Sequence, residues 1–196
     1  MKARDYIERD SVYGHLKVAV FIDMQNLYYG ARNTLKKKID FKRLLEIAVR
    51  GRKLHRAIAY LVDLDNVNQG SFLYVLRSLG YEIKLKQPKK FYSWDKIEYK
   101  ADWDMGIAID AIAMAESGKI DVAVLMSGDG DFVDLVNFLK AKGIKVEVIS
   151  FKPITAKELI VAADEYIDLY EVSDFIVLKE ENSHGGEDIS AGPFGG

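Results

Sequence analysis

Short apolar runs alternate with longer stretches of helical periodicity along most of this chain. Two of the runs are continuous, ValAlaValPheIle at residues 18–22 and ValAlaValLeuMet at residues 122–126. Such runs are typical of strands that are buried on both faces of a parallel sheet covered by helices. We therefore predict an α/β fold, a three-layer sandwich around a mainly parallel sheet, with these two strands as its central pair.

The same periodicity gives the remaining elements. The predicted strands are 17–23, 55–62, 81–86, 121–126, 144–150 and 166–170. The predicted helices are 27–35, 41–50, 71–79, 103–117, 132–141 and 156–163. Gly80, Gly118 and Gly143 follow three of these helices, at positions where a helix C-cap favours a residue that tolerates left-handed geometry.

Length and composition predict one folded domain. A chain of 196 residues with 49% hydrophobic content can bury a substantial core. We assign residues 17–175 to this domain and residues 1–16 to an N-terminal arm. Residues 180–196 have too few apolar side chains to offset the entropy of ordering, so they are predicted to be a disordered tail.

Several classes of protein are excluded or disfavoured by composition. The chain has no cysteine, which excludes disulfides and thiolate metal sites and suits a reducing compartment. The apolar run at 18–22 is too short to span a bilayer, and the preceding MKARDYIERD is too acidic for a signal peptide. We therefore expect a cytoplasmic protein that has no membrane partner.

Acidic residues follow the two buried runs. Asp23 ends the first, and Ser127-Gly128-Asp129-Gly130-Asp131 follows the other. If the strands are neighbours, their acids lie close together at the carboxyl edge of the sheet, because adjacent strands are only ~4.8 Å apart. Carboxylates this close require a cation or a proton. The alternative is structural, since Asp23, Asn26 and Asp131 are also suited to capping the helices that follow.

A third acidic segment begins the helix predicted at 103–117. Asp102 and Asp104 lie at its start, where negative charge also favours the helix dipole. Asp110 lies about 240° around the helix from Asp104, so both cannot face one metal ion, and we assign Asp110 a structural or supporting role. Clusters of carboxylates without cysteine or grouped histidine select hard cations such as Mg²⁺ or Mn²⁺.

Lysines and aromatic residues are interleaved before this helix. Residues 83–100 carry an excess of four positive charges, whereas Lys and Arg (28) nearly balance Asp and Glu (30) over the whole chain. Rings that stack on bases and lysines that follow phosphates would suit single-stranded RNA. The predicted contacts are Lys86, Lys89, Lys90, Phe91, Tyr92, Trp94 and Lys100. A solvated loop with its rings against the core is the alternative. Tyr28 and Tyr29 could stack on bases in the same way, but packing within their helix is favoured.

Four motifs in this order resemble the NYN domain, in particular its LabA-like branch: PheIleAspMetGlnAsn, LysAlaAspTrpAsp, SerGlyAspGlyAspPhe and LysGlyIleLysValGluVal. The resemblance covers residues 17–170. It implies the PIN-like nuclease fold and a metal-dependent ribonuclease that acts on single-stranded or structured RNA. The family more often has Gly-Glu or Gly-Ser where this chain has Met24-Gln25, and often has proline at the position of Asp134.

By this resemblance, the site acids of the family correspond to Asp23, Asp104, Asp129 and Asp131, with support from Asn26 and Ser127 and with Asp102 as a substitute for Asp104. We assign metal binding to Asp23, Asp104 and Asp129, and the orientation of the attacking water to Asp131. Mg²⁺ or Mn²⁺ would activate that water and stabilise the leaving oxygen.

Other functions stay open to different degrees. A phosphatase with Asp23 as nucleophile would need an acid at Gln25, and no GlyXGlyXXGly follows the first strand to bind a dinucleotide. Asp63 and Asp65 could extend the acidic site or open a turn. The main alternative is a catalytically weak regulator that binds RNA or protein, because members of the LabA-like branch have been regarded as regulators. Self-association into a homo-oligomer also stays open.

Overall fold

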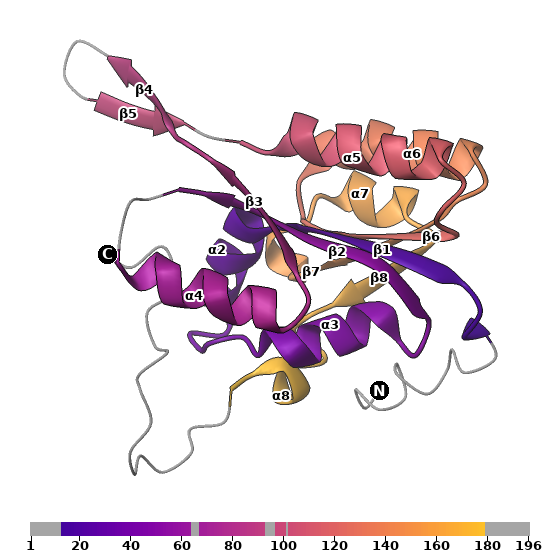
Figure 1. Ribbon diagram of the computed structural model, residues 1–196, viewed down its shortest axis with the longest axis horizontal. Coiled ribbons are helices and arrows are strands. Elements are labelled where there is room, and N and C mark those ends of the chain that lie inside the picture. The colour runs from indigo at the N-terminus through magenta and orange to yellow at the C-terminus, as the bar shows by residue number, and fades with distance from the viewer. Residues whose placement is uncertain (1–12, 64–66, 93–96, 101, 179–196) are drawn as a thin grey trace.

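In the computed structural model, the described residues are 13–63, 67–92, 97–100 and 102–178. Their helices and strands follow one another along the chain as in Figure 1. In order they are β1 (Lys17–Asp23), α2 (Met24–Thr34), α3 (Phe41–Val49), β2 (Lys53–Val62), α4 (Val67–Ser78), β3 (Glu82–Lys86), β4 (Lys89–Tyr92), β5 (Ile97–Lys100), α5 (Asp104–Glu116), β6 (Val122–Met126), η2 (Gly130–Phe132), α6 (Val133–Ala141), β7 (Lys145–Ser150), η3 (Lys152–Ile154), α7 (Lys157–Ala162), β8 (Glu165–Asp168) and α8 (Ser173–Ile176).

One parallel sheet organises these elements. Its six strands have the order β3-β2-β1-β6-β7-β8, and every neighbouring pair is parallel. The two continuous apolar runs pair directly, with Val20 opposite Val124. They are the central pair, as predicted, and their side chains are buried on both faces of the sheet.

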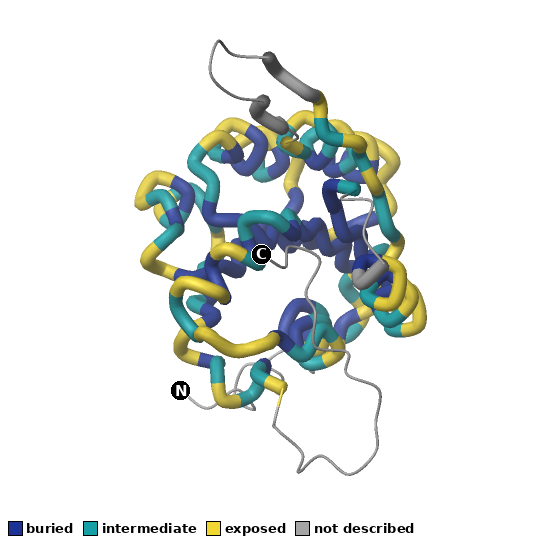
Figure 2. Tube along the Cα trace, turned by 90° about the vertical axis from the view of Figure 1, so that its left-hand side faces the viewer, coloured by how far each residue is buried: buried dark blue, intermediate teal, exposed yellow. Residues whose placement is uncertain are grey.

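Helices cover both faces, which confirms the predicted three-layer sandwich (Figure 1). Val18, Val20 and Ile22 of β1 pack into one core with α2, α3, α4 and α8. Ala19 and Phe21 point to the other core, beneath α5, α6 and α7. Buried residues accordingly run through the centre of the molecule in Figure 2, with exposed ones on the outer surfaces of the helices. Among the described helices, none combines the length and the apolar character needed to cross a membrane.

Most predicted boundaries agree with the structure to within one or two residues, and Gly80, Gly118 and Gly143 have the positive φ expected of helix C-caps. The largest errors are at helix starts. Helix α2 begins at Met24 instead of residue 27, because the Asp23 carboxylate accepts a hydrogen bond from the Asn26 amide and starts the helix at once. Helix α4 begins at Val67 instead of residue 71.

Two kinds of element were missed. The lysine-rich segment after β3 forms an antiparallel ribbon of β4 and β5, with Lys89 opposite Lys100 and Tyr92 opposite Ile97. This ribbon is a separate two-stranded sheet, and each of its strands has only four residues, which is the shortest run in which an alternating pattern can be recognised. The short helix α8 was also missed. It packs against α3 through Ile176, which is fully buried.

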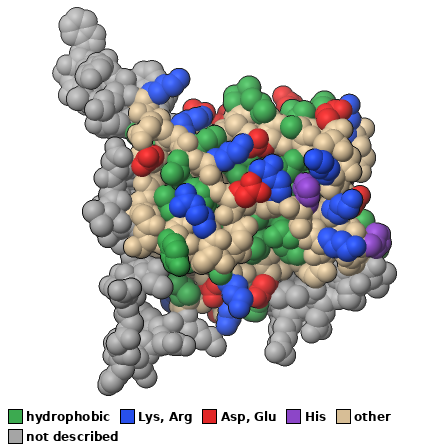
Figure 3. Space-filling model, in the orientation of Figure 1, with side chains coloured by type: hydrophobic (Ala, Val, Ile, Leu, Met, Phe, Trp, Pro, Cys, Tyr) green, Lys and Arg blue, Asp and Glu red, His purple; other side chains and the backbone are tan. Residues whose placement is uncertain are grey.

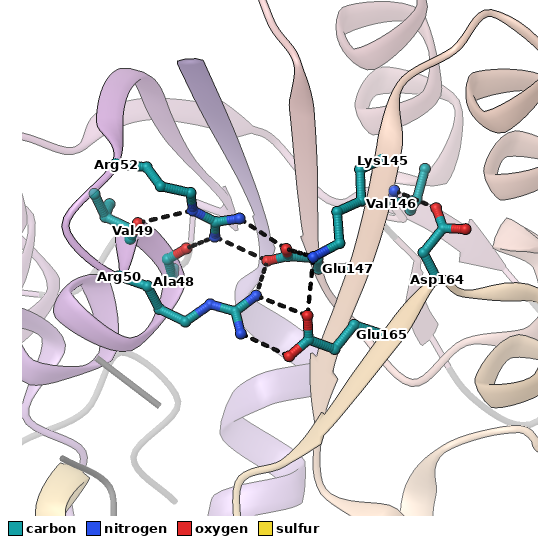
Figure 4. A network of polar contacts seen from close by, with 9 residues as sticks. All are labelled: Ala48, Val49, Arg50, Arg52, Lys145, Val146, Glu147, Asp164 and Glu165. Atoms are coloured by element: carbon teal, nitrogen blue, oxygen red, sulfur yellow. Dashed lines mark hydrogen bonds and ion pairs between the residues drawn. The ribbon is translucent and has the colours of Figure 1, made fainter. Parts of the chain in front are cut away.

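A network of buried charges lies near the amino ends of the strands, at the other end of the sheet from the acids (Figure 4). Glu147 of β7 has no exposed surface, and it accepts contacts from Arg50 (2.6 Å), Arg52 (2.7 Å) and Lys145 (2.9 Å). Arg50 and Lys145 also pair with Glu165 of β8, at 2.6 Å and 3.0 Å. The network therefore joins the loop after α3 to both strands at one edge of the sheet.

Arg52 also terminates α3. Its guanidinium donates to the carbonyls of Ala48 (2.8 Å) and Val49 (3.0 Å), which are among the carbonyls at the C-terminal end of this helix. Arg50 and Gly51 both have positive φ and turn the chain from the helix into β2. One short loop thus satisfies a helix end and supplies both arginines of the network.

Candidate metal centre

The predicted site acids lie at the point where the strand order reverses. From β1 the chain builds the sheet outward through β2 and β3, and it then returns to the other side of β1 with β6, β7 and β8. In open parallel sheets this reversal leaves a crevice at the carboxyl ends of the two central strands. Asp23 ends β1 at this crevice, and Ser127 and Asp129 follow the end of β6.

Both strand-end acids also cap the helical turn that follows them. Asp23 Oδ1 accepts a hydrogen bond from the Asn26 amide at 3.1 Å, and Asp129 Oδ1 accepts one from the Asp131 amide at 3.0 Å. The capping role considered from the sequence is therefore present for Asp23, whereas Asp129 caps the second turn in place of Asp131, and Asn26 lies inside α2. Capping is compatible with a functional role, because each capping hydrogen bond fixes the direction in which the carboxylate points.

Asn26 and Ser127 connect the two loops at the crevice. The Ser127 hydroxyl, which is almost completely buried, donates to Asp23 Oδ2 at 3.3 Å and accepts from the Asp129 amide at 3.2 Å. Asn26 Oδ1 accepts from the Gly128 amide at 2.9 Å. These contacts are those expected of supporting residues, since they hold Asp23 and Asp129 in a fixed relation.

Asp104 reaches the same crevice from the first turn of α5. Carboxylate oxygens of Asp104, Asp129 and Asp131 all lie within 4.8 Å of one another. A pocket of about 230 Å³ adjoins this cluster and is lined by Asp23, Gln25, Asn26, Tyr29, Asp102, Trp103, Asp104 and Asp129. Asp104 and Asp129 belong both to the cluster and to the lining of the pocket. Asp23 belongs to the lining alone, and Asp131 to the cluster alone.

The electrostatics of the crevice favour a cation. Burial raises the pKa of the Asp104 carboxyl to about 6, and its acidic neighbours act in the same direction: Asp129, Asp23, Asp102 and Asp131. Burial also raises the pKa of Asp23; hydrogen bonds from Asn26 and Ser127 oppose this rise, and the charge of Asp129 adds to it. Carboxylates whose charged forms are disfavoured in this way gain most from a bound positive ion.

The donor set fits Mg²⁺ or Mn²⁺. Every side chain in the tight cluster offers a carboxylate oxygen, which is the ligand type that hard divalent cations prefer. Asp104 and Asp129 would hold such an ion, with Asp23 or Asp131 completing its protein ligands. The chemistry supplied by the ion would be activation of a water molecule and stabilisation of the leaving oxygen.

Asp110 has a structural role on a different side of α5. Its carboxylate accepts hydrogen bonds from Lys84 Nζ at 2.6 Å and from the Tyr60 hydroxyl at 2.6 Å. Both partners belong to strands of the sheet, β3 and β2. The Asp110 carboxylate is thus paired, and it holds α5 against the edge of the sheet.

The predicted RNA contacts are only partly described. Lys86 Nζ donates to the Asp102 carbonyl at 2.6 Å and lies 4.5 Å from the centre of the Trp103 ring, so Lys86 supports the start of α5. Lys89 is exposed at the start of β4. The backbones of Lys90, Phe91, Tyr92 and Lys100 belong to the β4–β5 ribbon, but their side chains lie outside the described part of the chain, as does Trp94.

Asp63 and Asp65 did not join the described site. Asp63 accepts a hydrogen bond from Gln87 at 2.8 Å and does not line the pocket. Asp65 lies outside the described residues.

Three pocket residues were not predicted from the sequence. Gln25 and Tyr29 of α2, together with Trp103 at the start of α5, line the pocket beside the acids. Gln25 and Tyr29 lie four residues apart, on the face of α2 that also carries Asn26. That spacing was available in the sequence, and Tyr29 lines the pocket in addition to packing against Tyr28 of its own helix.

Comparison with known proteins shows the family of this chain. The profile of the NYN domain matches residues 17–173. The chain belongs to the NYN family. It is 33% identical over 169 residues to the "Low amplitude and bright protein LabA" of Synechococcus elongatus, a match that covers 84% of this chain and 89% of LabA. The predicted membership, including the likeness to LabA, is thereby confirmed.

A solved structure shares the fold. The crystal structure of a protein of unknown function from Vibrio parahaemolyticus superposes with a TM-score of 0.73 at 32% sequence identity, and the match covers 84% of this chain and 98% of that chain. NYN domains form a PIN-like nuclease family. This chain therefore has an acidic pocket and a cluster of three carboxylates within the fold of a PIN-like nuclease family.

Proposed function

We propose that this NYN protein is a metal-dependent ribonuclease that hydrolyses phosphodiester bonds of single-stranded or structured RNA in the cytoplasm. The observation that carries the proposal is the meeting of Asp104, Asp129 and Asp131 at the reversal of the strand order, with carboxylate oxygens within 4.8 Å. Mg²⁺ or Mn²⁺ is the proposed cofactor, and RNA is the proposed partner.

The roles of the residues follow from their contacts. Asp104 and Asp129 would bind the ion, and Asp23 would add a ligand from the wall of the pocket. Asp131 would accept the proton of the attacking water, because its carboxylate is the exposed member of the cluster. Asn26 and Ser127 would act as positioning residues, since they hold the two strand-end loops together.

The direct test is cleavage of a defined, unstructured RNA by the purified protein with Mn²⁺. We expect cleavage that a chelator stops and that is faster than cleavage of duplex DNA, because a stiff duplex does not enter a narrow acidic pocket easily. Attack by water leaves 5′-phosphate and 3′-hydroxyl ends. Cyclic phosphate ends would contradict this chemistry, because they arise when the ribose 2′-hydroxyl is the nucleophile.

Variants separate a true activity from contamination. Asp104→Asn and Asp129→Asn should each abolish cleavage while the protein stays folded, because both remove a charge that the ion needs. The matched control is Asp134→Asn, an exposed acid of α6 that lies outside the pocket and the cluster. Equal trace activity in all four proteins would identify a contaminant, and the protein would then be a regulator that binds RNA or protein.

A further inference from the structure

The pocket contains side chains that a metal site does not require. Beside the acids it is lined by Gln25, Tyr29 and Trp103, two aromatic rings and one amide. Aromatic rings are poor ligands for hard cations, whereas they provide stacking surfaces for nucleobases. Their presence next to the acids indicates that the pocket receives a ligand with a flat apolar part as well as an anionic part.

The ring of Trp103 is held in place before any ligand binds. Its Nε1 donates to the Leu61 carbonyl at 2.8 Å, and its ring centre lies 5.3 Å from that of Tyr60. A β-carbon at Gly106 would lie 2.5 Å from Trp103 Cε3, so glycine in the next turn of α5 is what allows the ring to lie against the helix. Lys86 Nζ also lies over the ring, 4.5 Å from its centre, so Trp103 gives the pocket a fixed apolar wall that loses little freedom when a ligand binds.

Tyr29 enters the pocket from the other layer of the sandwich. It belongs to α2, which packs on the opposite face of the sheet from α5, and half of its surface is exposed (50%). Tyr28 packs edge-to-face against it, with ring centres 6.2 Å apart. Rings from both layers therefore meet at one pocket at the carboxyl edge of the sheet, and Gln25 lies one helical turn before Tyr29.

We propose that Tyr29 and Trp103 form a subsite that binds one nucleobase beside the metal centre, with the Gln25 amide hydrogen-bonding to the edge of that base. The phosphate joined to the base would then lie against the acids and their ion, so the inference rests on the proposed function for its orientation. A pocket of about 230 Å³ is below the usual size of a ligand pocket, about 300–1,000 Å³, so it suits a single base better than a base pair. The subsite therefore selects single-stranded nucleic acid.

Calorimetry with nucleoside 5′-monophosphates tests the subsite without any cleavage. The full chain is titrated with adenosine or uridine 5′-monophosphate in Mg²⁺, and with ribose 5-phosphate, which has the same phosphate and sugar but no base. We expect the nucleotides to bind at least about fivefold more tightly than ribose 5-phosphate, the lower bound for one stacked base. Tyr29→Ala should remove this preference, and Tyr29→Phe should retain it because the ring remains.

Tyr74→Ala is the matched control, because Tyr74 is a more exposed tyrosine (72%) on α4 and does not line the pocket. Equal affinity for nucleotides and ribose 5-phosphate would overturn the subsite, even in a protein that cleaves RNA. A preference for the base that survives Tyr29→Ala would also overturn it. A preference that depends on Tyr29 in a protein without ribonuclease activity would support the subsite and remove the nuclease proposal alone.

Discussion

The charged form of Asp104 is disfavoured in the folded protein. Burial raises its pKa to about 6, and the surrounding carboxylates act in the same direction. The folded protein without metal therefore binds this proton more tightly than the unfolded chain does, between about pH 3.8 and pH 6. The stability associated with this proton is present below pH 3.8 and is lost as the pH rises through 6.

We predict that stabilisation by Mn²⁺ increases as the pH rises from 5 to 7.5, because the ion replaces that proton. At a metal concentration of 100 times the dissociation constant, the gain is about 2.7 kcal/mol. Thermal unfolding with and without Mn²⁺ across this range measures it. Asp104→Asn should give a smaller metal response that no longer changes near pH 6, and a wild-type response independent of pH would exclude Asp104 from the ion site.

Substitution of Asp110 should lower the stability of the fold and leave metal binding intact, in contrast to substitution of Asp104 in the same helix, α5. We predict that Asp110→Ala destabilises the fold by about 1–3 kcal/mol, because it leaves the Tyr60 hydroxyl without its acceptor. The metal response should remain. Urea unfolding measures the first effect, and Asp134→Ala, an exposed acid of α6, should stay within about 0.5 kcal/mol of wild type. Loss of the metal response in Asp110→Ala would show that the two acids form one site.

Among the helices and strands, features that depend on a local run of residues could be predicted from the sequence, and features that depend on contacts between distant residues could not. The strands β1 and β6 could be predicted because a run buried on both faces has an unmistakable composition. The acids could be located because the carboxyl ends of parallel strands share one edge. By contrast, the buried position of Glu147 depends on Arg50 and Arg52, which lie far from it in the chain, so no local sequence pattern predicts the network.

At the second position of the loop after β6, only glycine fits without displacing its neighbours. A β-carbon at Gly128 would lie 2.6 Å from the Ile154 carbonyl oxygen and 3.0 Å from Ser150 Oγ. We predict that Gly128→Ala costs about 1–3 kcal/mol by overpacking and weakens the response to Mn²⁺, because the loop that carries Asp129 must move. Gly70→Ala, where nothing lies within 4 Å, is the matched control and should be neutral or stabilising. An unchanged metal response in Gly128→Ala would mean that the loop tolerates displacement.

The charge network on β7 should account for a large part of the resistance of the fold to acid. Burial alone would raise the pKa of Glu147, but hydrogen bonds from Arg52 and the charge of Arg50 outweigh it and lower that pKa to about 2. Its contribution to stability is therefore present above pH 4.5 and is lost as the pH falls through about 2.

We predict that Glu147→Gln destabilises the protein by about 3–5 kcal/mol, because two arginines that are almost completely buried lose their shared carboxylate. Unfolding by urea at pH 7 and at pH 3 measures the loss and its decline in acid. Glu116→Gln, at an exposed pair with Lys142, should change stability by less than about 0.5 kcal/mol. Equal stability of Glu147→Gln and wild type would show that the network offsets only its own desolvation.

At the scale of the whole molecule, one face can be seen in Figure 3, and on it basic side chains are interspersed with acidic ones. Among the exposed pairs, Arg56 contacts Glu82. The β4–β5 ribbon concentrates lysines and projects beyond α5 in Figure 1, so RNA affinity is expected to depend on it.

We predict that Lys89→Ala with Lys90→Ala weakens the binding of single-stranded RNA of any sequence and reduces the slope of log affinity against log salt by about 1.4, the value for two lost phosphate contacts. Fluorescence anisotropy over a range of salt concentrations measures both quantities. Lys37→Ala with Lys38→Ala removes two adjacent exposed lysines beyond the end of α2 and should match wild type. If the two double variants weakened RNA binding equally, binding would depend on the net charge of the protein alone.

The separation of the acidic crevice from the buried charge network has a consequence for how such proteins diverge. The two lie at opposite ends of the same strands, about 15–20 Å apart for strands of this length. Mutations that erase the acids leave the network untouched, so under the proposed function a lineage could lose cleavage in one step and still inherit a folded protein with the same aromatic pocket.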